Sequence, residues 1–144
     1  MALKDSYQKV EIAAVAGEDV PTPWRGSSNV TLLASASRTT SQTGADTTNY
    51  NHAGIHAVLD MTTVGTGSVT LTIQGKDEAS GKYYTILAGA AVTTNSTNVY
   101  KVYPGITAAA NASASDVLPR TFRIIVTANN ANAATYSVGY SLIV

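Results

Sequence analysis

The feature of this sequence that most constrains its fold is an alternation of apolar and polar residues along several segments. In one segment Val69, Leu71 and Ile73 alternate with threonine and glutamine, and residues 135–143 repeat the pattern with tyrosine, valine and leucine. Successive side chains of a β-strand point to opposite faces, so this pattern predicts strands with one buried face. It favours an all-β fold.

The same alternation, in a strong or a weaker form, marks seven segments. The strong ones are residues 53–60, 68–75, 120–128 and 135–143, and the weaker ones are residues 29–36, 82–88 and 98–103. Their inward positions predict a core of Val69, Leu71, Ile73, Phe122, Ile124, Val126, Val138 and Leu142. Short strands separated by turns at this spacing are typical of sandwiches, so we expect an antiparallel β-sandwich of seven to eight strands.

Short turn sequences predict which of these strands are neighbours. Residues 64–67 (Val-Gly-Thr-Gly) and residues 76–81, which end in glycine, each join two predicted strands. Tight turns between amphipathic strands commonly close β-hairpins, so we expect a three-stranded antiparallel meander over residues 55–88. Residues 129–134 predict in the same way that the last two strands pair with each other.

Three segments lack the strand pattern. Residues 1–29 contain two prolines and a lone tryptophan and are interpreted as an extended N-terminal arm, ahead of a sandwich domain at residues 30–144. Residues 38–51 and 104–119 are long, weakly charged connections. A connection as long as residues 104–119 is uncommon in compact domains unless it serves contact or function, so we expect it to lie along a surface or a neighbouring chain.

The charge balance limits the kinds of partner. The chain of 144 residues has 9 Lys plus Arg and 9 Asp plus Glu, a formal net charge of 0. Nucleic-acid binding needs clustered basic residues, so we expect no nucleic-acid partner. No apolar run approaches the ~20 residues that span a bilayer, and no secretory signal is visible, so we expect no membrane partner and synthesis in the cytoplasm. A weakly charged surface suits a chain that binds copies of itself or a partner.

The residue types that usually carry catalysis or hold metal ions do not form a recognisable set. The sequence has no cysteine, which excludes thiolate chemistry and cysteine-based metal sites. His52 and His56 straddle a predicted loop and strand, where extended chain separates them by about 13 Å, too far to share one metal ion. Asp77 and Glu78 lie in a predicted turn, where carboxylates are commonly solvated. We therefore expect no enzyme activity, no bound metal and no cofactor.

The predicted arm carries the candidate partner-binding residues. An extended segment cannot bury apolar side chains in a core of its own, so these side chains need a surface supplied by something else. A proline-flanked tryptophan can anchor in the pocket of a partner, or it can fold back to cover its own sandwich. The candidate contact residues are Leu3, Tyr7, Val10, Ile12, Trp24 and Arg25.

Three stretches carry a resemblance to a known group of proteins. They are residues 73–87 (IQGKDEASGKYYTIL), 102–111 (VYPGITAAAN) and 116–124 (DVLPRTFRI), which mark strand ends and turns. These stretches resemble small virion proteins of tailed bacteriophages, a group that looks like capsid decoration or cement proteins. The resemblance extends over residues 35–142 and does not include the predicted arm.

The resemblance implies a jelly-roll-like sandwich, often trimeric, that sits on the outside of the phage head and stabilises the lattice. The implied partners are the major capsid protein and two further copies of the chain in a homotrimer, and the implied location is the capsid surface of the virion. Two alternatives stay open: a carbohydrate- or receptor-binding β-sandwich module of a phage particle, and a tail component.

Overall fold

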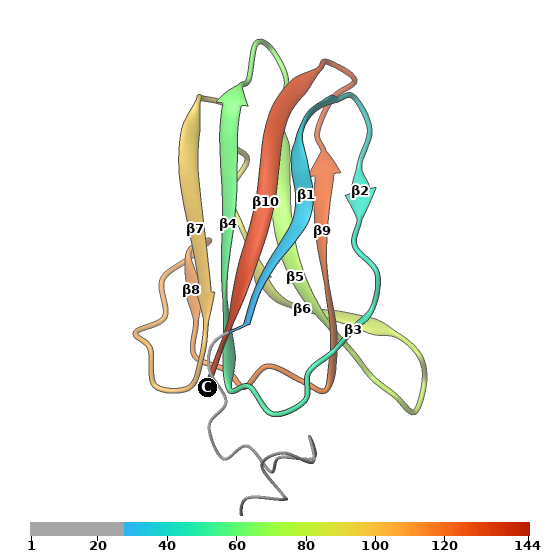
Figure 1. Cartoon of the computed structure of the whole chain (residues 1–144), viewed down its shortest axis with the longest axis vertical. Coiled ribbons are helices and arrows are strands. Elements are labelled where there is room, and N and C mark those ends of the chain that lie inside the picture. The colour runs from blue at the N-terminus through green and yellow to red at the C-terminus, as the bar shows by residue number, and fades with distance from the viewer. Residues whose placement is uncertain (1–27) are drawn as a thin grey trace, which may run out of the picture.

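The computed structural model describes residues 28–144, which form two β-sheets packed face to face (Figure 1). Sheet A has the strand order β1-β10-β4-β7-β8, and sheet B has the order β2-β9-β5-β6, with β3 also paired to β9. All neighbouring strands run antiparallel except β7 and β8. The strands are β1 (Ser28–Arg38), β2 (Gln42–Thr43), β3 (Thr47–Thr48), β4 (Gly54–Thr63), β5 (Val69–Lys76), β6 (Tyr83–Ala88), β7 (Ser96–Val102), β8 (Ser113–Ala114), β9 (Thr121–Ala128) and β10 (Ala134–Ile143).

The prediction of an all-β, antiparallel sandwich is therefore confirmed. Each of the seven segments with alternating residues forms a strand, with ends that differ by a few residues from the prediction. The three additional strands β2, β3 and β8 are two residues long and lie inside the segments predicted to be long connections.

Inward-facing residues of the alternating strands fill the space between the two sheets. On β10 every second residue from Ala134 to Leu142 is buried, and β5 follows the same rule. Phe122 of β9 and Tyr140 of β10 meet edge to face across the core with ring centroids 5.9 Å apart, a favourable aromatic geometry. All eight predicted core residues are buried, the most exposed being Leu142 at 6%. The predicted core is confirmed.

The predicted meander over residues 55–88 is wrong in its first half. β4 pairs with β10 and β7 in sheet A, whereas β5 pairs with β9 and β6 in sheet B. The chain after Thr63 therefore crosses from one sheet to the other. Alternation predicts which face of a strand is buried, but two strands that face each other across a core satisfy the same pattern as two neighbours. The second half is confirmed, because β5 and β6 do form a hairpin, in whose turn Gly81 has a φ of 70°.

The predicted pairing of the last two strands is wrong for the same reason. β9 belongs to sheet B and β10 to sheet A, so residues 129–133 are a second crossing between the sheets. The two crossings lie against each other, because the side-chain amides of Asn130 and Asn132 donate to the Thr66 carbonyl oxygen at 3.0 and 3.3 Å. They thus brace each other at one end of the sandwich.

The two long connections are anchored to the sandwich. Residues 38–51 contribute β2 and β3 to the edge of sheet B, and residues 104–119 contribute β8 to the edge of sheet A. Asn49, which is buried, ties them together: its side-chain amide donates to the carbonyl oxygens of Leu118 at 3.0 Å and of His52 at 2.8 Å. Its side-chain oxygen accepts the His52 backbone N–H at 2.8 Å. A buried amide with these partners holds both segments in one conformation.

The boundary of the predicted arm shifts slightly. β1 begins at Ser28, so Ser28 and Asn29 belong to the sandwich, and the rest of the predicted arm lies outside the described residues. Within residues 28–144 there is no helix with the length and apolar character that crossing a bilayer requires.

The burial pattern of β9 gives a direct test of the core. Ile124 is 2% exposed, and an Ile124→Asp substitution would bury a carboxylate with no cation beside it, at a cost of several kcal/mol. That cost is a large part of the ~5–15 kcal/mol that stabilises a typical domain, so we expect loss of soluble folded protein. Thr127→Asp, on the exposed face of the same strand, is the control. Wild-type melting behaviour of the Ile124→Asp protein would contradict the assignment of the buried face.

Candidate binding surface

The outward face of sheet A has small, uncharged residues along β10. Its outward positions are half-buried and include Ser137, Gly139 and Ser141, whereas the inward positions of the same strand carry tyrosine, valine and leucine. The strands on either side of β10 carry larger side chains outward, such as His56 and Val58 on β4. Small residues between larger ones leave a depression along the middle of the sheet.

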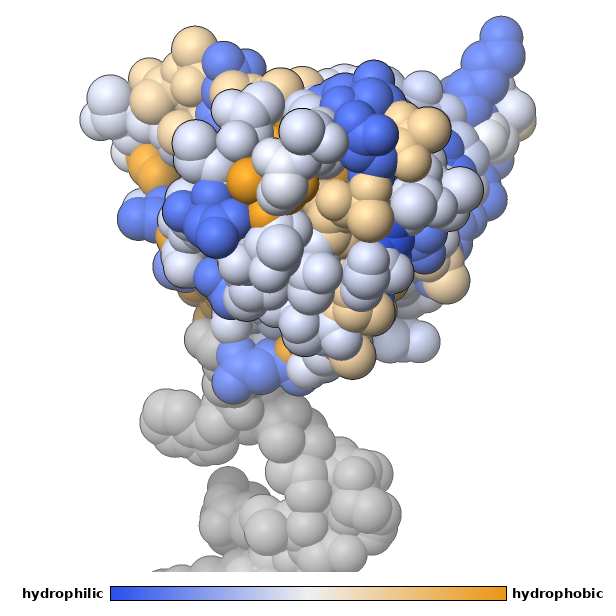
Figure 2. All heavy atoms as spheres, turned by 90° about the horizontal axis from the view of Figure 1, so that it is seen from above, coloured by the Kyte–Doolittle hydropathy of each residue, from blue (hydrophilic) through white to orange (hydrophobic). Residues whose placement is uncertain are grey.

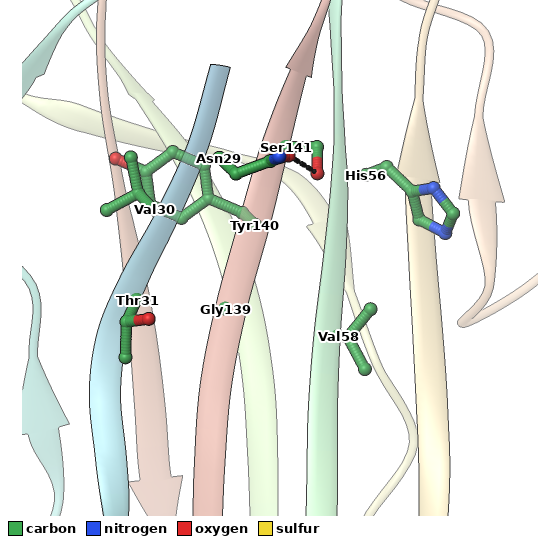
Figure 3. Close-up of a pocket in the computed structure, with 8 residues that line it drawn as sticks. All are labelled: Asn29, Val30, Thr31, His56, Val58, Gly139, Tyr140 and Ser141. Atoms are coloured by element: carbon green, nitrogen blue, oxygen red, sulfur yellow. Dashed lines mark hydrogen bonds between the residues drawn. The ribbon is translucent and has the colours of Figure 1, made fainter. Parts of the chain in front are cut away.

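This depression is a hollow of about 370 Å³ that we call the trough (Figure 3). The residues that shape it are Asn29 and Thr31 on β1, Gly139 and Ser141 on β10, and His56 and Val58 on β4. The strand register places Asn29, Ser141 and His56 in one row across the sheet. Thr31, Gly139 and Val58 form the next row.

The trough combines a hydrogen-bonded polar pair with apolar side chains beside it. The Ser141 hydroxyl donates to the Asn29 side-chain oxygen at 2.6 Å, the contact drawn as a dashed line in Figure 3. This hydrogen bond holds the two side chains over the β1–β10 seam. Beyond Val58 the same row reaches Val99 on β7, which is 38% exposed. A partner that covers this face therefore meets hydroxyl and amide groups beside exposed aliphatic carbon.

A second hollow, of about 480 Å³, lies where β10 ends, and we call it the terminal hollow. Its lining is mainly apolar and consists of Ala53, Tyr103, Pro104, Ile143 and Val144, together with the polar side chains of His56 and Lys101. His56 lines both hollows, so the two adjoin at this side chain. The His56 Nε2 atom is buried and has no hydrogen-bond partner in the described part of the chain.

Few charges interrupt this face. On the described strands of sheet A, the outward positions of β4 and β7 carry Asp60 and Lys101, which lie in different rows. Asp60 accepts a hydrogen bond from the Thr97 hydroxyl at 2.8 Å. Figure 2 views the end of the sandwich from above, where strongly hydrophilic spots lie among residues of intermediate hydropathy, and the outward face of sheet A likewise has few charged side chains. Covering such a surface desolvates few ions, which lowers the cost of docking.

The outward face of sheet B is different, because its charged side chains contact one another. The Lys76 ammonium of β5 lies 2.8 Å from an Asp46 carboxylate oxygen, and the Tyr83 hydroxyl donates to the same carboxylate at 2.7 Å. The Arg123 guanidinium stacks 3.3 Å from the centroid of the Tyr83 ring and donates to the Gln74 side-chain oxygen at 2.9 Å. This group of five residues, the sheet B cluster, ties the segment around Asp46 to three strands.

The cluster shifts the ionisation of its members. The hydrogen bond from Lys76 lowers the pKa of Asp46 below its usual value, and the hydrogen bond from Tyr83 lowers that pKa further. The Asp46 carboxylate in turn raises the pKa of Lys76. Both groups are thus held in their charged forms by mutual contact. A salt bridge and a stacked guanidinium are features of a contact that holds neighbouring segments together.

The structure places the sequence-predicted residues as follows. The candidate contacts Leu3, Tyr7, Val10, Ile12, Trp24 and Arg25 lie outside the described residues. His52 lies in the connection before β4, and His56 lies on the outward face of β4. Within residues 28–144 no three His, Asp or Glu side chains are grouped so that they could hold a metal ion. The trough was not predicted, although the Ser-Gly-Ser alternation on β10 was visible in the sequence.

Comparison with models of known protein families and with curated protein sequences finds no match for this chain. Its function is therefore inferred from the surface, the fold and the sequence resemblance.

The sheet B cluster predicts a pH-dependent contribution to stability. Because the pKa of Asp46 is lower in the folded state than in the unfolded chain, its contribution is present above the unfolded value of about 3.9 and is lost as the pH falls through the folded value. We expect Asp46→Asn to melt at a lower temperature than wild type at neutral pH, and the two melting temperatures to converge below about pH 4. Thermal denaturation across pH 2–7 measures this, and a constant difference across that range would contradict the prediction.

Proposed function

We propose that this chain is a structural protein of a tailed-phage particle, which binds the outside of the head and stabilises its lattice. The supporting sequence evidence is the resemblance of residues 73–87, 102–111 and 116–124 to capsid decoration proteins. The supporting structural observation is the outward face of sheet A, which is weakly charged and contains the trough. On the opposite face of the sandwich, the charged side chains of sheet B already contact one another. No catalytic step is part of this proposal.

The strand order supports the finer proposal that the sandwich is a jelly roll. If β2 and β3 are counted as one interrupted strand and β8 is set aside, the remaining strands form two four-stranded sheets. Successive strands then change sheets, except at the β5–β6 hairpin. Double-sheet jelly rolls of eight strands are found in viral capsid proteins and in lectins. The fold is thus compatible with a role in a particle and, on its own, also with the alternative of carbohydrate binding.

A lattice-stabilising protein gains most of its binding energy by touching several subunits at once. Linked contacts raise each other's effective concentration, so several weak contacts act as one strong contact. We propose three contact regions: the outward face of sheet A, the segments 38–51 and 104–119, and the arm with Leu3, Tyr7, Val10, Ile12, Trp24 and Arg25. The partners are the major capsid protein and further copies of this chain.

The role of sheet A can be tested by placing a charge on it. Val99→Asp puts a carboxylate on an exposed position of this face, and we expect it to weaken binding to empty heads of the encoding phage at least tenfold, about 1.4 kcal/mol or more. Co-sedimentation with heads measures the occupancy. Thr127→Asp, at an exposed position on the outward face of sheet B, adds the same charge and is expected to bind as wild type.

A second variant tests the trough itself. A Cβ atom on Gly139 would lie 3.4 Å from the Val30 carbonyl oxygen and meet no other non-neighbouring heavy atom within 4 Å, so Gly139→Gln should fill the trough without disturbing the sheet. If heads bind Val99→Asp and Gly139→Gln as tightly as wild type, sheet A is not the contact. If the wild-type protein does not bind heads at all, the proposed function is wrong.

The proposed homotrimer predicts the mass of the free protein. A charge-poor surface can pack around a threefold axis without desolvating many ions, so self-association is inexpensive. We expect sedimentation equilibrium at micromolar concentration to give three times the chain mass of 14.9 kDa. A single-chain mass that persists up to the highest soluble concentration would contradict a free trimer.

A further inference from the structure

The terminal hollow has the properties of a site for an apolar side chain with one polar atom. Its volume of about 480 Å³ falls in the range of sites that hold small organic groups, roughly 300–1,000 Å³. Ile143 and Val144 provide its apolar wall, and Val144 is 60% exposed in the described structure. The buried His56 Nε2 atom at its border has no hydrogen-bond partner among residues 28–144. Leaving such an atom unsatisfied is costly, so a small rotation of the imidazole toward an occupant with a hydrogen-bond donor is favoured.

The chain itself contains a candidate occupant close to the terminal hollow. β1 begins at Ser28, which pairs with Leu142, the residue next to Ile143 in the wall of the hollow. Strands are about 4.8 Å apart, and one strand separates β1 from β4, so His56 on β4 lies roughly 10 Å from the β1 axis. Trp24 precedes Ser28 by a stretch of chain that can span up to about 14 Å. The indole of the same chain can therefore reach the terminal hollow without rearrangement of the sandwich.

We propose that Trp24 binds in the terminal hollow of its own chain and anchors the preceding residues to the end of sheet A. This inference goes beyond the proposed function and does not depend on it. It assigns Trp24 to its own chain, so that Leu3, Tyr7, Val10 and Ile12 stay as the apolar candidates for contact with a partner. The terminal hollow is the binding site, and its occupant is the segment around Trp24.

The chemistry of the two partners is complementary. The indole Nε1–H is a hydrogen-bond donor only, and the His56 Nε2 atom is an acceptor in the neutral tautomer that carries its proton on Nδ1. The indole ring is apolar and suits Ile143, Val144 and Pro104, while its face can attract the Lys101 ammonium through a cation–π contact. A Leu or Phe side chain would fill the space but would leave His56 Nε2 without a partner.

Intramolecular docking is also favoured by entropy. A tether as short as the one between Trp24 and Ser28 holds the indole near the hollow at a high effective concentration. Pro21 and Pro23 restrict the backbone of the same segment before docking, which lowers the conformational entropy lost on binding. A second copy would need to bring its own Trp24 to the same site without this advantage.

Fluorescence tests the proposal directly, because Trp24 is the single tryptophan of the chain. In the wild-type protein we expect a blue-shifted emission and several-fold weaker quenching by acrylamide than for a free indole. Ile143→Ser and Val144→Asp should each shift the emission to the red and increase the quenching, because they remove the apolar wall. Val99→Ser is the control, since it lies on the same face but outside the terminal hollow. Thermal melting confirms that each variant is folded.

A mixing experiment separates docking within one chain from docking between copies. Co-expressed Ile143→Ser and Trp24→Phe chains can restore a protected tryptophan only if the indole of the first chain enters the intact hollow of the second. We expect no restoration. Restored protection of the tryptophan would show that the indole of one copy binds in the hollow of another, and it would overturn the proposal. A solvent-exposed emission in wild type, or emission unchanged in both wall variants, would also overturn it.

Discussion

The structure depends on one constraint: each of its amphipathic strands can bury only one face, so the two sheets must cover each other. Val138 and Leu142 on β10 face residues such as Ile124 and Val126 on β9, and all four are buried. Neither sheet alone could shield its apolar face from water. The crossings after β4 and after β9 follow from this constraint, because each carries the chain from one half of the core to the other. The hydrogen bonds between the crossings then fix how the sheets meet at that end.

The sequence predicted the strands and the buried faces well because both depend on local alternation. It predicted neighbouring strands poorly because pairing is not local. Residues 64–67 have the composition of a hairpin turn, yet β4 finds its partners in β10 and β7, which lie far away in the chain. A short connection between two amphipathic strands is compatible with a hairpin or with a crossing, and the choice depends on which arrangement completes both sheets. Hydrogen bonding by the Asn49 side chain, which joins two long connections, leaves no comparable signal in the sequence.

The candidate surface could be predicted only in part for a related reason. The Ser-Gly-Ser alternation on β10 indicates that its outward side is small, but a trough exists only because β1 and β4 stand beside it in a particular register. The sheet B cluster joins Asp46, Tyr83 and Arg123, residues whose closeness no spacing rule predicts. The arm residues singled out from composition belong to a segment that the structure does not describe. The sequence did predict a surface with few charged residues, and the outward face of sheet A has few.

The two outward faces therefore have different capacities for binding. On sheet B, the carboxylate of Asp46 and the cations of Lys76 and Arg123 already have partners within the chain, so a ligand would have to displace contacts that hold strands together. On sheet A, the trough and the terminal hollow offer hydroxyl groups, exposed aliphatic carbon and an unsatisfied imidazole nitrogen on a rigid scaffold. Binding at the trough costs little desolvation and breaks no internal contact, whereas a partner at the terminal hollow would compete with the proposed anchor Trp24. The charged groups on the outward face of sheet B are satisfied within the chain, whereas the outward face of sheet A is open. Under the proposed function, this difference gives the sandwich one preferred docking face.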